Sequence, residues 1–120
     1  KKEAGQNIIF INNLPQAELV QYYQLATVHV LPSWFETAGL SSLEAAAMGC
    51  NIVITDRGDA KDYFGDMATY CDPSSPESIR AAIDKAASGK ADPALSEIIN
   101  SKFTWEQAAF ITNEAYNAII

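Results

Sequence analysis

Residues 28–55 read VHVLPSWFETAGLSSLEAAAMGCNIVIT, and this stretch decides the fold. It contains two short apolar runs, residues 28–31 and 51–55, separated by a loop and an alanine-rich segment. Continuous apolar runs of this length indicate buried strands. The segment from about Gly39 to Met48 predicts a helix, and Gly49 is suited to end it. Strand, helix and strand in succession predict a parallel pair joined by a crossover helix.

The pattern continues on both sides of this stretch. Further strands are predicted at residues 7–11 and 68–71, and further helices at 15–26, 75–88, 93–100 and from 104 onward. In the helix predicted at residues 75–88, Ser75 is a candidate N-cap, and Pro76 suits the first helical position. The prediction is therefore an α/β fold, a Rossmann-like parallel sheet with helices on both faces. Ligands of such sheets bind at the carboxyl ends of the strands.

Composition limits the function classes. The chain has 120 residues and a net charge of −7, enough for one domain and unfavourable for nucleic acid or anionic lipid as a partner. No apolar run approaches the roughly 18 residues that a membrane span needs. Cys50 and Cys71 are expected to be buried free thiols, and His29 to be a packing residue. The first residue is not Met, so we expect the sequence to begin inside a longer protein.

Two acidic residues, Glu36 and Glu44, flank seven small or apolar residues. We expect Leu40, Leu43 and Ala47 to face the sheet, which places Glu44 at the border of the apolar stripe. A carboxylate that leaves water needs hydrogen-bond donors. These come either from protein groups or from the hydroxyls of a ligand, and a ribose diol offers two donors at matching spacing.

The start of the predicted helix suggests an anion site. Backbone N–H groups of the helix N-terminus, together with the helix dipole, suit a diphosphate. The residues concerned are Thr37, Ala38, Gly39, Leu40 and Ser41. Glu36, just before them, would lie beside a third ligand group. The alternative is that both glutamates are ordinary surface residues, with Glu36 favouring the positive end of the helix.

The wider pattern resembles the retaining glycosyltransferases of family 4. The motifs that carry the resemblance are PS-x-F-E-x-x-G-L, E-A-x-A-x-G, D-P and F-T-W-E, and the similarity runs from Asn7 to the C-terminal helix. The resemblance implies the two-domain GT-B fold. It identifies residues 1–120 as part of the C-terminal, donor-binding domain and places the N-terminal acceptor domain outside this chain.

The resemblance also implies roles for individual residues. Glu36 would be catalytic, contacting the donor sugar near the reacting carbon, and Glu44 would bind the ribose hydroxyls. The backbone of residues 37–41 would meet the diphosphate and the sugar. Leu14, with Asn13 beside it, would meet the base. The donor would be a nucleotide-sugar, the acceptor a glycan, lipid or small molecule, and neither a metal nor another cofactor would be required.

Several features depart from the family pattern. Ala38 stands where the family often has an aromatic residue, and Asn51 where it often has Pro. The basic residues that clamp the diphosphate lie upstream in the family, so we expect this chain alone to be inactive. A different interpretation is a non-catalytic nucleotide-sugar-binding or scaffold module. Either way, the expected location is cytoplasmic, at most peripheral to a membrane through the missing part.

The predicted last helix leaves a further alternative open. Its aromatic residues either pack on the domain's own sheet or remain partly exposed where the first domain is missing. These residues are Trp105, Phe110 and Tyr116.

Overall fold

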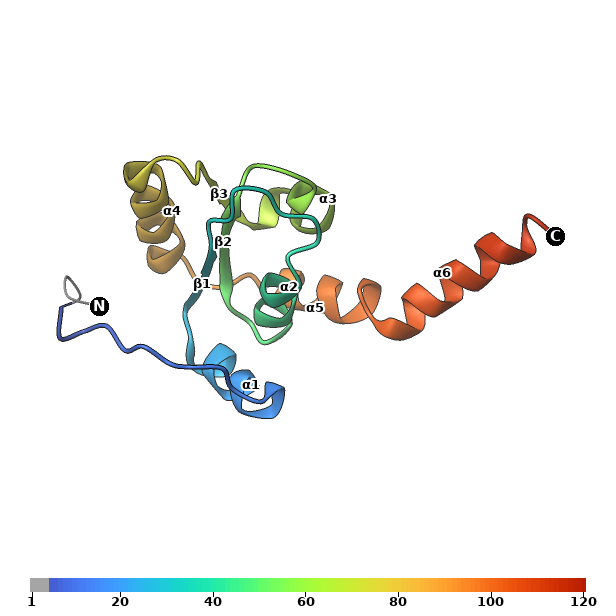
Figure 1. Ribbon diagram of the computed structural model, residues 1–120, viewed down its shortest axis with the longest axis horizontal. Helices are drawn as coiled ribbons and strands as arrows, with labels where there is room; N and C mark the ends of the chain where they lie inside the picture. The colour runs from blue at the N-terminus through green and yellow to red at the C-terminus, as the bar shows by residue number, and fades with distance from the viewer. Residues whose placement is uncertain (1–4) are drawn as a thin grey trace.

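The computed structural model describes residues 5–120 and contains a three-stranded parallel sheet (Figure 1). The strands are β1 (Val28–Leu31), β2 (Asn51–Thr55) and β3 (Thr69–Cys71), in the spatial order β1-β2-β3. Val28 is in register with Asn51, and Val53 with Thr69. The parallel pairing confirms the predicted α/β fold, and β2 is the central strand.

Helices fill most of the remaining chain. They are α1 (Gln16–Leu25), α2 (Leu40–Ala47), α3 (Ala60–Phe64), α4 (Pro76–Ser88), α5 (Pro93–Lys102) and α6 (Trp105–Asn117), with a short 3-10 helix at Gly65–Met67. The helix boundaries largely follow the predicted signals. The Ser75 hydroxyl accepts the Ser78 amide at 3.1 Å, and Pro76 opens α4. Gly49 follows α2 with a φ of 93°.

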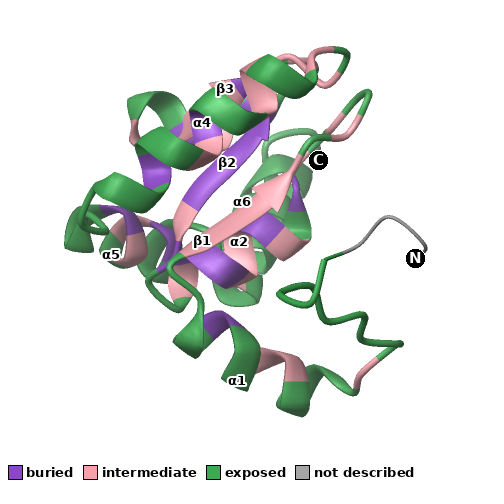
Figure 2. Ribbon diagram, turned by 90° about the vertical axis from the view of Figure 1, so that its left-hand side faces the viewer, coloured by how far each residue is buried: buried purple, intermediate pink, exposed green. Residues whose placement is uncertain are grey.

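The sheet is covered on both faces, as predicted (Figure 2). Because side chains alternate along a strand, Ile52 and Ile54 pack on one side, in a cluster with residues of α1, α2, α3 and α5. Val53 packs on the other side with Ala82 and Ala86 of α4. Residues 52–55 of β2 are at most 1% exposed, so the core is centred on this strand.

The predicted strand at residues 7–11 is wrong. These residues are exposed and form no strand, and within residues 5–120 the sheet begins at β1. Ile8, Ile9 and Ile11 are between 47% and 83% exposed. The apolar run indicates strand propensity, but a strand also requires a neighbour whose backbone groups can pair with it. A local pattern carries no information about that neighbour.

The predicted apolar stripe of α2 needs correction. The most deeply buried side chains of this helix are Ser42, Ala45 and Ala46, each at most 1% exposed. Leu43 and Ala47 are partly buried and pack against the same core cluster, as predicted. Leu40 is instead 68% exposed. Gly39, with a φ of 65°, is the N-cap residue and turns the chain immediately before the helix.

The C-terminal helix α6 extends away from the rest of the domain (Figure 1). None of its residues is buried. Trp105, Phe110 and Tyr116 are 86%, 60% and 65% exposed, so they do not pack on the domain's own sheet. The structure therefore agrees with the alternative in which the aromatic side chains of the last helix remain exposed.

Candidate functional site

Glu36 lies in the loop between β1 and α2, at the carboxyl end of the sheet. Both oxygens of its carboxylate have donors. Oε1 accepts the backbone N–H of Gly39 at 3.2 Å, and Oε2 accepts the hydroxyl of Ser33 at 3.2 Å. The side chain is half-buried. Two donors from its own loop therefore hold the carboxylate in one orientation.

The backbone of Glu36 is held by a different segment, the loop after β2. The Glu36 N–H donates to the carbonyl of Arg57 at 3.2 Å, and the Glu36 carbonyl accepts the N–H of Asp59 at 2.9 Å. Together these bonds form a single parallel bridge between Glu36 and Gly58 outside the sheet. The two loops that follow β1 and β2 are thereby joined.

The residues predicted to meet a diphosphate surround the N-terminus of α2. Thr37 and Leu40 are exposed, Ala38 and Ser41 are half-buried, and Gly39 is buried. The first helical turn closes with the Ser42 and Leu43 amides on the Gly39 carbonyl, at 2.8 and 2.9 Å. The first amides of a helix have no acceptor within the helix itself, so those of Leu40 and Ser41 remain available to an anion.

Glu44 finds a donor within the protein. Gln16, the first residue of α1, donates from Nε2 to Oε1 of Glu44 at 3.1 Å. Glu44 is half-buried on α2, and this contact is solvent-exposed. The sequence left open whether donors to Glu44 come from the protein or from a ligand, and the protein supplies one of them. The bond occupies one lone pair of the carboxylate and leaves acceptor capacity for a ligand.

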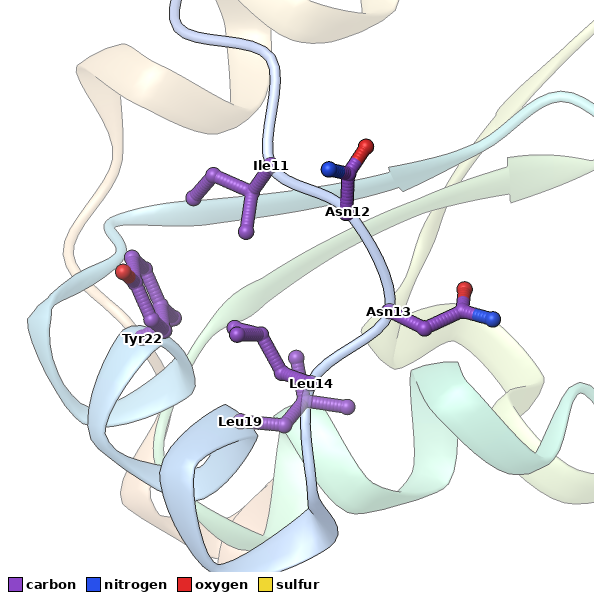
Figure 3. A pocket seen from close by; sticks show the side chains of 6 residues that line it. All are labelled: Ile11, Asn12, Asn13, Leu14, Leu19 and Tyr22. Carbon is purple, nitrogen blue, oxygen red and sulfur yellow. The ribbon is translucent and has the colours of Figure 1, made fainter.

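Asn13 and Leu14 lie beside this contact and line an open pocket of about 410 Å³ (Figure 3). The remaining lining residues are Ile11, Asn12, Leu19 and Tyr22. The lining combines apolar side chains, one aromatic ring and two amides, as small-molecule pockets commonly do. Gln16 follows Leu14 by two residues and contacts Glu44, so the segment that carries the predicted base residues is joined to the helix that carries the predicted ribose residue.

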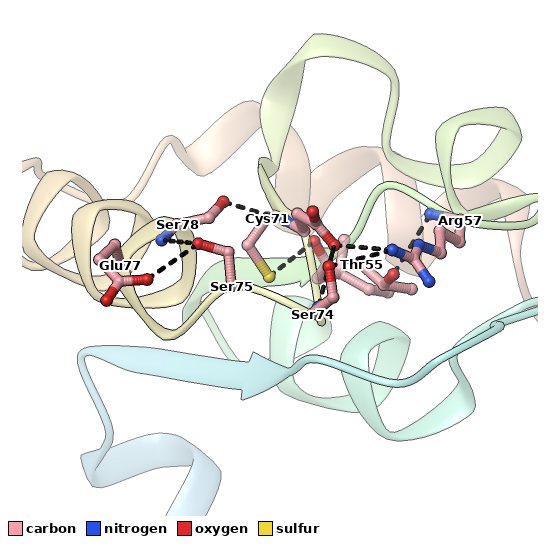
Figure 4. Close-up of polar contacts among 9 residues, drawn as sticks. Thr55, Arg57, Cys71, Ser74, Ser75, Glu77 and Ser78 are labelled. Carbon is pink, nitrogen blue, oxygen red and sulfur yellow. Dashed lines mark hydrogen bonds and ion pairs between the residues drawn. The ribbon is translucent and has the colours of Figure 1, made fainter.

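Arg57 links the site to the end of β3. Its guanidinium donates to Asp72 Oδ1 at 2.8 Å and to the Ser74 hydroxyl at 3.3 Å, and Figure 4 shows Arg57 facing the Ser74 turn. It also lies 5.2 Å from the ring centroid of Trp34. Hydrogen bonds from Ser74, followed by the charge of Arg57, lower the pKa of Asp72. The ion pair is therefore present at neutral pH.

Among residues 5–120, no three His, Cys, Asp or Glu side chains are grouped so that they could hold a metal ion. No helix in the same range combines the length and the apolar character needed to cross a membrane.

Comparison with known proteins identifies the family. The family model described as "Glycosyl transferases group 1" matches residues 1–102. The chain belongs to the group 1 glycosyl transferases. This match covers both glutamates, the pocket at Asn13 and Leu14, and the loop that carries Gly58.

The group 1 assignment agrees with individual relatives. The chain is 31% identical over 116 residues to a glycogen synthase of Mycobacterium tuberculosis, which covers 91% of this chain and 28% of that protein. It is 27% identical over 119 residues to O-antigen chain mannosyltransferase B of Escherichia coli, covering 93% of this chain and 30% of the relative. The chain thus spans about three-tenths of the length of these relatives.

A solved structure confirms the fold of this group 1 domain. Sucrose-phosphate synthase from Thermosynechococcus elongatus superposes with a TM-score of 0.79 at 25% identity, over 96% of this chain and 31% of that one. This likeness confirms a Rossmann-like fold of the GT-B type. The assignments of individual site residues remain predictions.

Sequence reasoning missed three residues of this group 1 site that the structure brings to the glutamates. Ser33 and Gln16 donate to Glu36 and Glu44, and Gly58 pairs with the Glu36 backbone. The loop holding Gly58 follows a predicted strand, so its position at the carboxyl edge was a usable signal. Gln16 lies 28 residues from Glu44, and nothing in the sequence marks that contact.

Proposed function

We propose that this chain is the donor-binding part of a retaining glycosyltransferase that transfers a sugar from a nucleotide-sugar to a glycan, lipid or small-molecule acceptor. The observation that carries the proposal is the placement of the two glutamates. Glu36 is oriented by two donors at the carboxyl end of β1. Glu44 lies on the next helix and contacts Gln16, two residues beyond Leu14 of the pocket.

In the proposed complex, each part of the donor has its own protein partners. The base occupies the pocket at Asn13 and Leu14, and the ribose hydroxyls donate to the Glu44 carboxylate. The diphosphate lies at the N-terminus of α2, against the backbone of residues 37–41, where the amides of Leu40 and Ser41 and the helix dipole favour negative charge. The sugar lies beside Glu36. No metal or other cofactor takes part.

The proposed chemistry is departure of the nucleoside diphosphate. The bond between the anomeric carbon and the diphosphate oxygen breaks, and its electron pair leaves with the diphosphate. The acceptor oxygen forms the new bond to the anomeric carbon on the face that the diphosphate leaves, and its proton passes to the leaving diphosphate oxygen, so the anomeric configuration is retained. Glu36 stabilises the positive charge that builds at the anomeric carbon. A covalent intermediate on Glu36, as in retaining glycosidases, is the less favoured route.

Other parts of the enzyme complete the site. The chain carries 15 acidic and 8 basic residues, which is unfavourable for holding a diphosphate without further cations. We expect the basic clamp and the acceptor-binding domain to come from outside these 120 residues. The chain alone should therefore show no transfer and bind nucleotide-sugar at best at about millimolar concentration, worth about 4 kcal/mol.

The test compares two variants of the full-length protein that contains this chain. Glu36→Gln should lower kcat by about 100-fold or more with little change in nucleoside diphosphate affinity, because the charge it stabilises develops only in the transition state. Glu44→Gln should instead weaken nucleoside diphosphate binding by about 1.5–3 kcal/mol. The measurements are steady-state kinetics and calorimetric titration, after a screen of UDP-, GDP- and ADP-sugars by saturation-transfer NMR.

The control is Glu97→Gln, which removes the same charge from an exposed position on α5 and should change neither quantity. Normal nucleotide binding by Glu44→Gln together with normal turnover by Glu36→Gln would return both glutamates to the surface-residue interpretation. Nucleotide-sugar binding without any turnover would support the non-catalytic module instead. A product of inverted configuration, seen by NMR, would exclude the retaining reaction.

A further inference from the structure

The loop after β2 approaches the Glu36 loop so closely that a side chain does not fit between them. Gly58 has a φ of 98°, and a Cβ built on it would overlap the carbonyl oxygen of Glu36. The same Cβ would lie 3.0 Å from the Glu36 carbonyl carbon and 3.1 Å from its nitrogen. All three are backbone atoms, so the clash cannot be relieved by rotating a side chain.

This close approach coincides with the two hydrogen bonds that fix the Glu36 backbone. Arg57 and Asp59, on either side of Gly58, accept from and donate to Glu36 at 3.2 and 2.9 Å. The glycine therefore occupies the centre of the bridge. Any residue with a Cβ at position 58 would push the two loops apart and lengthen both bonds.

The loop is itself anchored at its far side. The Arg57 guanidinium pairs with Asp72 at 2.8 Å beyond the end of β3, and the same group lies over the Trp34 ring. The backbone carbonyl of Arg57 therefore accepts the hydrogen bond from the Glu36 N–H, and the Arg57 side chain anchors the loop to the end of β3. Asp72, Arg57 and Glu36 thus form a continuous chain of contacts across the carboxyl ends of all three strands.

The Glu36 carboxylate depends on this backbone position. Its partner at Oε1 is the Gly39 amide, three residues away, and its partner at Oε2 is Ser33, three residues in the other direction. Both donors belong to the loop that the bridge holds in place. A shift of the Glu36 backbone would therefore move the carboxylate relative to both donors and to any sugar beside it.

We infer that Gly58 is a positioning residue for Glu36, and that the loop at residues 56–59, anchored by the Arg57–Asp72 pair, sets the reach of the Glu36 carboxylate toward the donor sugar. The inference rests on the proposed function of Glu36. It adds a residue that touches no part of the donor and acts only through the backbone of another loop.

The experiment exploits a matched pair of glycines in the full-length protein. Gly49 has a φ of 93°, close to that of Gly58, but a Cβ there would have no atom within 4 Å. Gly49→Ala and Gly58→Ala therefore both place a Cβ at a positive φ, and only Gly58→Ala displaces Glu36. Thermal unfolding of both variants measures how far each is destabilised and confirms that both are folded.

Gly58→Ala should lower kcat by about 100-fold while the Kd for nucleoside diphosphate stays within about threefold, because misplacing a reacting group by about 1 Å has effects of this size. Gly49→Ala should leave both constants within about threefold. A second readout does not need turnover. The NMR signal of the Gly39 amide, which donates to Glu36, should shift from its position in the parent protein in Gly58→Ala and not in Gly49→Ala, and this shift is the Gly39 response.

The outcomes separate this inference from the proposed function. If Glu36→Gln is impaired but Gly58→Ala resembles Gly49→Ala in kcat and in the Gly39 response, the inference is overturned and the proposed function stands. If Glu36→Gln is fully active, the proposed function fails, and the Gly39 response alone decides whether Gly58 positions Glu36.

A further variant covers the case in which Gly58→Ala does not fold. Asp72→Ala removes an exposed anchor of the loop and should leave the fold intact, since exposed ion pairs contribute little to stability. It should lower kcat by about three- to tenfold with unchanged nucleoside diphosphate affinity. An unchanged kcat would then overturn the inference.

Discussion

Strand β2 and helix α6 are both rich in apolar side chains, yet they have opposite environments. Residues 52–55 of β2 are almost completely buried, whereas α6 has no buried residue. Trp105, at the start of α6, is 86% exposed, while Phe64 of α3, packed in the cluster below β2, is fully buried. A similar apolar content therefore has very different consequences for the stability of the domain.

The difference teaches what an apolar pattern can and cannot predict. Both elements form where their local sequence predicts them, because period and capping are local properties. Burial depends instead on a partner surface, and β2 has one on each side while α6 has none among residues 5–120. Free energy of burial is gained only where apolar area leaves water. The three predictions that follow test this contrast, from the largest expected effect to the smallest.

Replacing the buried ring should have the largest effect. Phe64→Ala should lower the free energy of unfolding by about 3–5 kcal/mol, because it removes apolar contacts and leaves a cavity. Trp105→Ala, the matched control on α6, should change it by less than about 0.5 kcal/mol. Urea unfolding of this chain measures both. A decrease of more than about 1 kcal/mol in the free energy of unfolding of Trp105→Ala would mean that α6 packs on the domain in solution. The contrast between β2 and α6 would then be wrong.

The start of β2 provides a smaller test. Asn51 donates from its side-chain amide to the carbonyls of Ala86 and Gly89, at 2.9 and 3.2 Å, and so ties β2 to the end of α4. Asn51→Ala should cost about 1–2 kcal/mol in the same unfolding assay. Asn113→Ala, at an exposed position in α6, should be neutral or slightly stabilising because Ala favours helix. Equal effects of the two changes would show that the bond at Asn51 contributes nothing.

The third test is a pH dependence on β1. Burial lowers the pKa of His29 from its ordinary value of 6.5, and the buried Nε2 atom has no hydrogen-bond partner among the described residues. The unfolded chain therefore binds a proton more readily than the folded one. Stability should be fully present above about pH 6.5 and should fall as the pH drops toward the lowered pKa of the folded state.

The melting temperature between pH 7.5 and 5.5 measures this effect, and His29→Gln should flatten the slope because it removes the titrating group. This range lies above the ordinary pKa of carboxyl groups, so their titration contributes little. A slope that is the same with and without His29 would contradict the prediction. It would show that the imidazole is solvated in both states.

The sequence by itself determined the elements and the two glutamates. Short apolar runs fixed the three strands, and Ser75 with Pro76 fixed the start of α4. These features depend on neighbouring residues alone, so they can be derived without coordinates. The spacing of Glu36 and Glu44 likewise placed one in a loop and the other on a helix, where the structure has them.

Only the tertiary structure decided which elements found partners and how the glutamates are held. Within residues 5–120, it left residues 7–11 outside the sheet and α6 without buried side chains. It also brought Gln16 to Glu44 and Gly58 to Glu36, across 28 and 22 positions of sequence. Such contacts depend on where separate segments meet in space. Their positions follow from the packing of α1, α2 and β2 into one core, which no local pattern encodes.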